Sequence, residues 1–354
     1  MKLAVLYLLG LLGITLAVTV DRQAAPDTEP KAMRAAAMAF LDSLDEKLRE
    51  QATFVFDDGE RKAWSNLPHT MFKRLGVRFG EMSKKQKVLA HHLIQSPLSS
   101  SGYLKVSGIM HVDEILQSFA EARGRTGDPM FGQDYYWIGI FGDPVTDAVW
   151  GWQLDGHHLA LNFTVVGDQI TVTPTFLGAD PAEVRDGIYA GFRPLGAEDD
   201  QGLRLFATLD EAQRKLAVIA DTAPADVIAG PKRAHLLAKV EGLPASKMKP
   251  DQRELLMRLI GEWAHNLDIP LALDQLARIR KAGIDAIHFA WAGTEKGKPY
   301  YYRIHGPTVL IEFDNSFAPG RRAGPVNHIH TVWRDLEHDY GGDLLRKHYE
   351  EHHR

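Results

Sequence analysis

Similar segments recur in the same order along this chain of 354 residues, and the repeat limits its fold more than any other feature. FLDSLDEKL at Phe40–Leu48 returns 165 positions later within LFATLDEAQRKL at Leu205–Leu216. MSKKQ at Met82–Gln86 returns 166 positions later as MKPDQ at Met248–Gln252. A third pair of aromatic-rich segments aligns Gly156 with Gly306. Repeats in a constant order are typical of a duplicated unit, so we expect two diverged copies.

Each copy has helical periodicity first and strand alternation afterwards. In the first copy the apolar residues Met33, Ala37, Phe40, Leu41 and Leu44 recur at helical spacing. Aromatic and β-branched residues then alternate as strands do. We expect strands at 136–141, 149–154, 159–165, 169–174, 287–291, 299–304 and 309–313. Helices grouped before antiparallel strands predict an α+β fold, with two pseudo-symmetric copies of a helices-then-meander unit.

The repeat also predicts how the chain is divided. We expect residues 31–176 to form the first copy, 177–202 a linker, 203–333 the second copy and 334–354 a C-terminal extension. The extension has no counterpart in the first copy. What the copies do not share is where we look for a specialised site.

The first 25 residues indicate export. One basic residue, Lys2, precedes an apolar run from Leu3 to Val20, which is typical of a secretory signal peptide. The run is also long enough to span a bilayer as an uncleaved anchor. We therefore expect a periplasmic or extracellular protein, attached to a membrane only if this segment is not removed.

Composition excludes several classes of function. The sequence has no cysteine, which removes disulfides, thiolate nucleophiles and cysteine-bound metal centres. The net charge of −5 provides no positive field for nucleic acid. No serine-nucleophile, phosphate-loop, dinucleotide or HExxH motif occurs. Any metal ion must therefore be bound by His, Asp or Glu.

Histidines give the strongest indication of a metal site. His328 and His330 are two residues apart, which on a strand turns both imidazoles to one face. His157 and His158 follow an expected turn, and strand alternation predicts that only one of them, taken here as His158, reaches the same site. Glu312 could supply a carboxylate. Such a set suits zinc, copper or iron, although an HxH pair is more often part of an ordinary half-exposed strand.

Other residues could support this site or line a ligand cleft. His157, Asp314, Arg334 and Asp335 could orient the ligating groups, and ordinary ion pairs are the alternative. Trp150 and Trp333 could form a stacking wall for a ring-shaped ligand, and burial in the core is the alternative.

Long motifs resemble one known family. They are WGWQLDGHHLALNFT, TPTFLGADP at Thr173–Pro181, FAWAG at Phe289–Gly293, YYRIHGPTVLIEFDN, NHIHTVWRD and DYGGDLLRKHY. Together they resemble the DUF3500 family of exported bacterial proteins of unknown function. The resemblance implies one family domain over residues 31–350 and a signal sequence, and it implies no activity.

Two hypotheses for the function follow. The first is an exported metal-binding hydrolase or oxidase that uses the histidines. The second is a periplasmic or secreted protein that binds a small molecule, without catalysis, in an aromatic cleft between the copies. The sequence leaves open whether the protein is an enzyme.

Overall fold

The computed structural model describes residues 29–352, apart from 126, 128, 296, 318, 319, 321 and 322. The expected signal peptide or anchor at residues 1–25 lies outside the described residues. Within the described part of the chain, no helix has both the length and the apolar content needed to cross a membrane.

Helices and strands alternate in groups along the described residues. The α-helices are α1 (Glu29–Asp42), α2 (Glu46–Ala52), α3 (Lys84–Gln95), α4 (Ser100–Ala122), α5 (Gly196–Ala207), α6 (Glu211–Ala217), α7 (Pro250–Ala264), α8 (Ile269–Gly283) and α9 (Gly342–His352). The strands are β1 (Thr53–Phe54), β2 (Val77–Arg78), β3 (Tyr136–Phe141), β4 (Val149–Gly156), β5 (Leu159–Val166), β6 (Gln169–Thr171), β7 (Thr175–Ala179), β8 (Val218–Ala220), β9 (Leu243–Pro244), β10 (His288–Ala292), β11 (Tyr300–His305), β12 (Leu310–Ser316) and β13 (His328–Arg334). The expected linker, 177–202, begins inside β7 and ends inside α5.

Side-chain caps fix where several helices begin. Asp45 accepts a hydrogen bond from the backbone N–H of Leu48 at 2.9 Å, so α2 starts as a separate helix just after α1. Ser83 and Gln86 form a reciprocal capping box at the start of α3. These caps satisfy backbone groups that the helix itself leaves unpaired.

All the strands of the described residues belong to one mixed sheet. Its order is β1-β3-β4-β5-β7-β13-β12-β11-β10-β8, with β2 on β3, β6 on β5 and β9 on β10. The meanders are antiparallel as expected, whereas β1 pairs parallel to β3 and β8 pairs parallel to β10. The antiparallel pair β7–β13 lies in the middle and joins the strands of the two halves.

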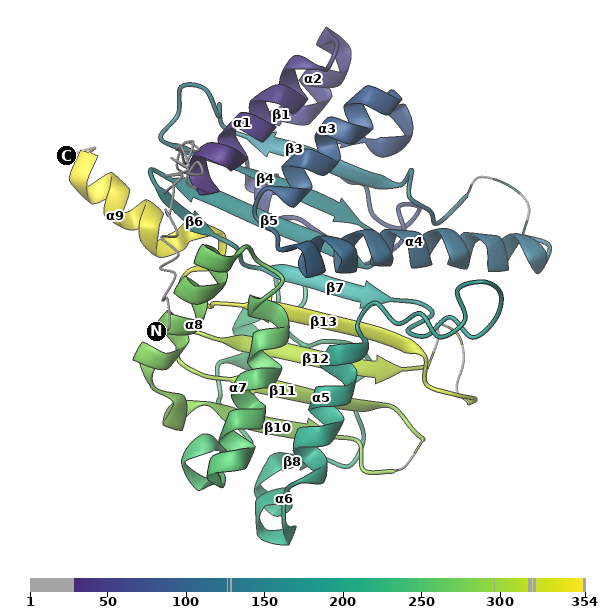
Figure 1. The fold of residues 1–354 in the computed structure, drawn as a ribbon, viewed down its shortest axis with the longest axis vertical. Helices are drawn as coiled ribbons and strands as arrows, with labels where there is room; N and C mark the ends of the chain where they lie inside the picture. The colour runs from purple at the N-terminus through teal and green to yellow at the C-terminus, as the bar shows by residue number, and fades with distance from the viewer. Residues whose placement is uncertain are drawn as a thin grey trace, which may run out of the picture.

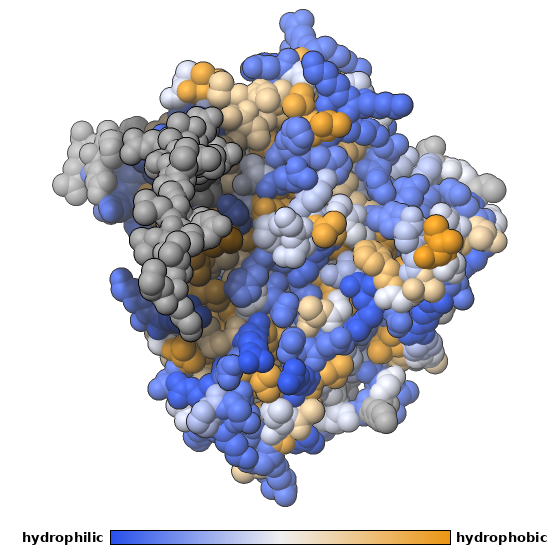
Figure 2. All heavy atoms as spheres, in the orientation of Figure 1, coloured by the Kyte–Doolittle hydropathy of each residue, from blue (hydrophilic) through white to orange (hydrophobic). Residues whose placement is uncertain are grey.

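The sheet separates two unequal layers. Helices α1, α3, α4, α5, α7 and α8 lie over one face (Figure 1), and the main apolar core fills the space beneath them. Seen from this side, the outer surface of α3 and α4 is mainly hydrophilic (Figure 2). On the other face, Trp64 and Val227 from loops pack against Phe176 of β7 and Val332 of β13. Neighbouring residues of β13 therefore point into different layers.

Candidate metal centre

The turn between β4 and β5 consists of His157 and His158. Gly156 and Leu159 form the last strand pair, which leaves only the two histidines to reverse the chain. The turn is held from both sides, because the Tyr136 hydroxyl donates to the carbonyl of His157 at 2.8 Å and the Gly178 N–H donates to the carbonyl of His158 at 2.7 Å. His158 takes a φ of +62°, which few residues with a side chain adopt.

The two imidazoles of this turn stack against each other. Their ring centroids are 3.7 Å apart, with 29° between the ring planes. Of the two, His158 has a ligand atom within 4.8 Å of those of His328 and His330, whereas His157 pairs with Asp113. The two residues form the turn between the strands, and His158 has a positive φ there.

On β13, His328 and His330 face the same side, as their spacing predicts. Their ring centroids are 4.4 Å apart. His330 lies directly opposite Gly178 of β7. A Cβ at Gly178 would stand only 2.9 Å from Cδ2 of His158, so the glycine leaves the room into which the His158 ring fits.

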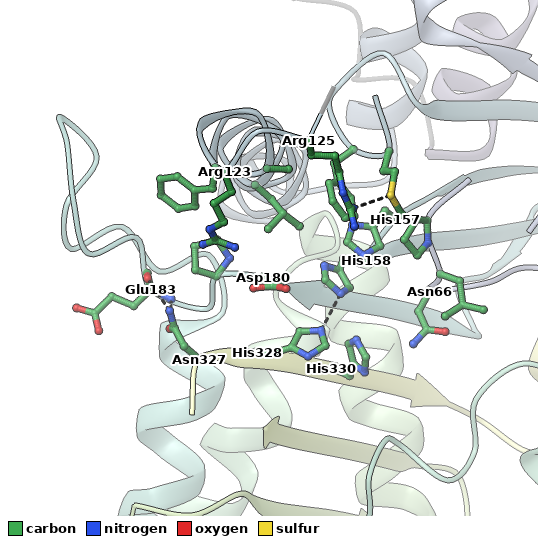
Figure 3. Close-up of a pocket in the computed structure, with 18 of the residues that line it drawn as sticks. Asn66, Arg123, Arg125, His157, His158, Asp180, Glu183, Asn327, His328 and His330 are labelled. Carbon is green, nitrogen blue, oxygen red and sulfur yellow. Dashed lines mark hydrogen bonds between the residues drawn. The ribbon is translucent and has the colours of Figure 1, made fainter. Parts of the chain in front are cut away.

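Three imidazoles converge at this point. The Nε2 atoms of His158 and His328 are 3.0 Å apart, and the ligand atoms of His158, His328 and His330 all lie within 4.8 Å of one another. Nε2 of His330 is buried and has no hydrogen-bond partner. Figure 3 shows the three rings close together, with Asp180 beside them. Tetrahedral zinc with Zn–N bonds of about 2.1 Å needs nitrogens roughly 3.4 Å apart, so a transition-metal ion fits this spacing.

Carboxylates hold two of the four imidazoles in place. Nδ1 of His330 donates to Asp226 at 2.8 Å, and in the neutral ring this leaves the lone pair on Nε2. Nδ1 of His157 is 2.5 Å from Asp113 of α4, and the Gly132 N–H donates to the other oxygen of Asp113 at 2.9 Å. A carboxylate behind a histidine is the usual support for a metal ligand or a proton-accepting imidazole.

Burial sets the charge state of the cluster. Desolvation, and then the neighbouring histidines, hold the pKa of His158 and of His328 well below the ordinary value, so both are neutral and offer lone pairs. Burial also disfavours the charged form of His330, but the hydrogen bond to Asp226 and the nearby acidic charges raise its pKa overall. Desolvation raises the pKa of Asp180 to about 6.

The cluster opens into a cavity of about 1010 Å³. Its polar wall contains His157, His158, Asp180, Asp226, His328 and His330. Apolar side chains, among them Met71, Phe119 and Phe131, line another part of it. A molecule in this cavity would therefore contact both the histidines and an apolar surface.

Glu312 does not join the histidines. Its two oxygens accept hydrogen bonds from the backbone N–H groups of Ile228 and Ala229 at 2.8 and 2.6 Å, and from the Tyr301 hydroxyl at 2.7 Å. It lies opposite Val332, two pairs further along β12 and β13 than the pair formed by Asp314 and His330. Glu312 thus anchors a loop, whereas Asp314 lies 3.9 Å from Nδ1 of His330.

The other expected residues lie away from the cluster. Trp150 and Trp333 are buried in the core beneath the helices, and neither lines the cavity. Trp333 points away from His328 and His330 because it differs from them by an odd number of strand positions. Arg334 pairs with Asp339 at 2.6 Å, and Asp335 pairs with Arg278 at 3.0 Å.

Sequence reasoning missed three acidic residues of the site, Asp113, Asp180 and Asp226. Asp113 carries a usable signal, since it is a lone carboxylate among buried apolar positions of α4. Asp226 lies in a loop and has no local pattern that indicates its contact with His330. Asp180 is likewise outside any periodic segment.

Comparison with known proteins agrees with the motif resemblance. The family model described as a protein of unknown function, DUF3500, matches residues 27–342. No curated protein and no solved structure matches the chain. Since the family model spans most of the sequence, the chain belongs to the DUF3500 family.

Proposed function

We propose that this chain is an exported metal-dependent hydrolase in which His158, His328 and His330 bind a divalent transition-metal ion, most simply zinc. The observation that carries the proposal is the convergence of three buried imidazoles beside a cavity, with Nε2 of His330 unpartnered. Three imidazoles leave a coordination position for water, as in catalytic zinc sites. Export rests on the sequence of residues 1–25 alone.

The surrounding carboxylates favour a cation at this point. Asp180, Asp226 and Asp314 lie around His330, and the negative charge of each raises the pKa of its imidazole. Arg233, at 3.6 Å from Asp226, and Arg123, which acts on Asp180, offset part of this charge. A buried excess of negative charge is costly unless a proton or a metal ion balances it.

The chemistry would begin with water bound to the ion. Zinc lowers the pKa of bound water to about 7, and Nε2 of His157, which has no hydrogen-bond partner among the described residues, could accept the proton while Asp113 holds Nδ1. The hydroxide would attack a carbonyl or phosphoryl group, and the proton would then pass to the leaving group. This assigns His157 to proton transfer and not to metal binding.

Elemental analysis of the purified protein tests the metal site. Wild type should contain at least one transition-metal ion per chain, and a His328→Ala, His330→Ala double variant should contain almost none. His305→Ala is the matched control, because His305 is also a buried strand histidine but lies outside the cluster. Metal content near zero in all three proteins would rule the proposal out.

Hydrolysis is tested separately with p-nitrophenyl acetate and p-nitrophenyl phosphate. Turnover of either ester should disappear with chelator and return with zinc. His157→Ala should keep its metal and lose roughly 100-fold or more in rate, the usual contribution of a general base. A rate that ignores the chelator would contradict a metal-dependent reaction.

Binding without catalysis is the second candidate, and the size and mixed lining of the cavity favour it. The cavity receives residues from both halves, His157 and His158 from one and His328 and His330 from the other. Because the tryptophans lie elsewhere, a ligand would contact Phe119, Phe131 and Met71 instead. A thermal-shift screen on metal-stripped protein should then find a stabilising small molecule, and Phe131→Ala should weaken its effect.

We also infer that the two halves are diverged copies of one unit. The supporting observation is that β1 and β8, which start 165 residues apart, both follow a helix pair and both run parallel to the first strand of a meander. Gly76 and Gly242 occupy matching places with φ of +103° and +109°, each packed against a carbonyl of that strand. The histidine turn occurs in the first half only, since Pro307 and Thr308 follow Gly306 in the second.

A further inference from the structure

Asp314 is buried without the partners that a buried carboxylate needs. Its side chain is 1% exposed, and neither oxygen accepts a hydrogen bond in the described structure. The Ser316 hydroxyl lies close enough to favour the charged form of Asp314, although its hydrogen bond in this geometry is to the carbonyl of His328 at 3.3 Å. Among the described residues, its one ion-pair partner is His330, at 3.9 Å. A buried carboxylate in this state requires an explanation, such as a bound ion, an ordered water molecule or a proton on the carboxyl.

A second acidic residue faces the same edge of the His330 ring. Asp226 accepts the hydrogen bond from Nδ1 of His330 at 2.8 Å. One ligand atom each of Asp226, Asp314 and His330 lies within 4.8 Å of the others. Two carboxylate oxygens and an imidazole nitrogen are ligands that zinc, copper and manganese accept.

We propose that Asp226, Asp314 and Nδ1 of His330 bind a second divalent metal ion, so that the His330 imidazole bridges two ions. The bridge rests on the proposed function, because the first ion is the one held at Nε2 together with His158 and His328. When the second ion binds, the proton on Nδ1 that is now donated to Asp226 leaves to solvent. The two carboxylates and the bridging ring then balance the added charge.

The competing explanation is that Asp314 holds a proton and that Asp226 only orients His330. Both explanations place one ion at the three histidines. They differ in the number of ions bound and in whether two ions share one imidazole. Stoichiometry and magnetic coupling therefore decide between them.

Metal-stripped protein titrated with Zn²⁺ by equilibrium dialysis gives the number of ions. Wild type should bind two ions per chain and Asp314→Asn should bind one. Glu312→Gln is the matched control, since Glu312 is also a buried carboxylate of β12 but is saturated by Ile228, Ala229 and Tyr301. It should bind two. One ion in wild type, or two in Asp314→Asn, would overturn the second site.

Failure of the proposed function has a different signature. A His158→Ala, His328→Ala double variant should lose the first ion. If this variant binds zinc as wild type does, the three-histidine site is wrong whatever the result for Asp314→Asn. Wild type that binds no zinc at all overturns both sites.

A measurement on the unaltered chain avoids dependence on how the variants fold. Wild type loaded with Cu²⁺ should show an electron paramagnetic resonance signal that grows up to one equivalent. The second equivalent should diminish the signal, because a bridging imidazolate couples the two spins. A signal that doubles at two equivalents would show independent ions and would exclude the bridge.

Discussion

Buried charged and polar groups have partners at one end of the central β7–β13 pair and lack them at the other end. At one end, where Trp333 pairs with Thr175, Arg334 meets Asp339 at 2.6 Å and donates to the carbonyls of Ala229 and Gly230 at 2.7 and 3.0 Å. At the other end, where His330 pairs with Gly178, the ring has an unpartnered Nε2. Beside that ring, Asp314 has two unpartnered oxygens.

The groups with partners, at the Arg334 end, stabilise the fold. The groups without partners, at the His330 end, are in position to bind a ligand. Both ends belong to the same two strands, so strand geometry does not cause the difference. At the Arg334 end, Arg334 pairs with Asp339 and with the carbonyls of Ala229 and Gly230, which offsets the free-energy cost of burying its charge. At the His330 end the partners are missing on the side of the cavity, and a bound cation would supply them.

The largest expected effect is at the Arg334 end. Arg334→Ala leaves Asp339 buried without its cation and removes two further hydrogen bonds, and it should lower the free energy of unfolding by about 3–5 kcal/mol. Denaturant unfolding in the presence of chelator measures this. Arg258→Ala, which breaks an exposed pair with Glu254, should cost no more than about 0.5 kcal/mol.

The zinc content of the Arg334→Ala variant tests the same comparison between the two ends of the β7–β13 pair. If Arg334 serves the fold alone, the Arg334→Ala protein that remains folded should bind as much zinc as wild type. A variant with normal stability and lost metal would place Arg334 in the site and erase the distinction between the two ends.

The next effect is stabilisation by metal at the His330 end. Zinc at 100 times its dissociation constant should raise the free energy of unfolding of wild type by about 2.7 kcal/mol, because it binds the folded state only. The His328→Ala, His330→Ala variant should gain almost nothing. Equal stabilisation of both proteins would mean that zinc acts somewhere else.

The sequence predicts the strands far better than it predicts the site. The β3 segment, 136–141, agrees at both ends, and β4 and β5 agree to within two residues. The shared face of His328 and His330 also follows from spacing, because alternation is a local property of a strand. Local patterns of this kind depend on neighbouring residues only.

The rest of the site depends on contacts that no local pattern contains. Asp226 reaches His330 across 104 positions of sequence, and Asp113 reaches His157 across 44. Glu312 and Asp314 are both acidic and both point to the same face of β12, so no local pattern distinguishes one from the other as a ligand. Only the folded structure shows that the backbone N–H groups of Ile228 and Ala229 donate hydrogen bonds to Glu312.

A smaller effect is expected from the space that Gly178 provides. Gly178→Ala would place a Cβ 2.9 Å from the His158 ring and 3.0 Å from the carbonyl oxygen of Ile329, so the ring must shift. We expect a loss of about 2 kcal/mol in unfolding free energy and weaker zinc binding, measured by unfolding and by dialysis.

Gly306→Ala provides the control for this change. A Cβ at Gly306 would meet only side-chain atoms of Ile287 and Val309 closely, at 3.0 and 3.1 Å, far from the histidines. It should alter stability without altering zinc affinity. If both substitutions weaken zinc binding equally, the effect of Gly178→Ala is a general loss of stability. The space beside Gly178 is then not specifically required for zinc binding by His158.

The smallest effect concerns the backbone of the histidine turn. In metal-stripped protein, His158→Gly should be more stable than His158→Ala by about 0.5–1 kcal/mol, because glycine adopts a φ of +62° without the strain that a Cβ introduces. At His157, which has no positive φ, the order should reverse, since glycine there only adds freedom to the unfolded chain. Unfolding of the four variants by denaturant measures both differences. The same order at both positions would mean that the backbone of His158 is not strained, and that the ring reaches the other histidines without a conformational cost.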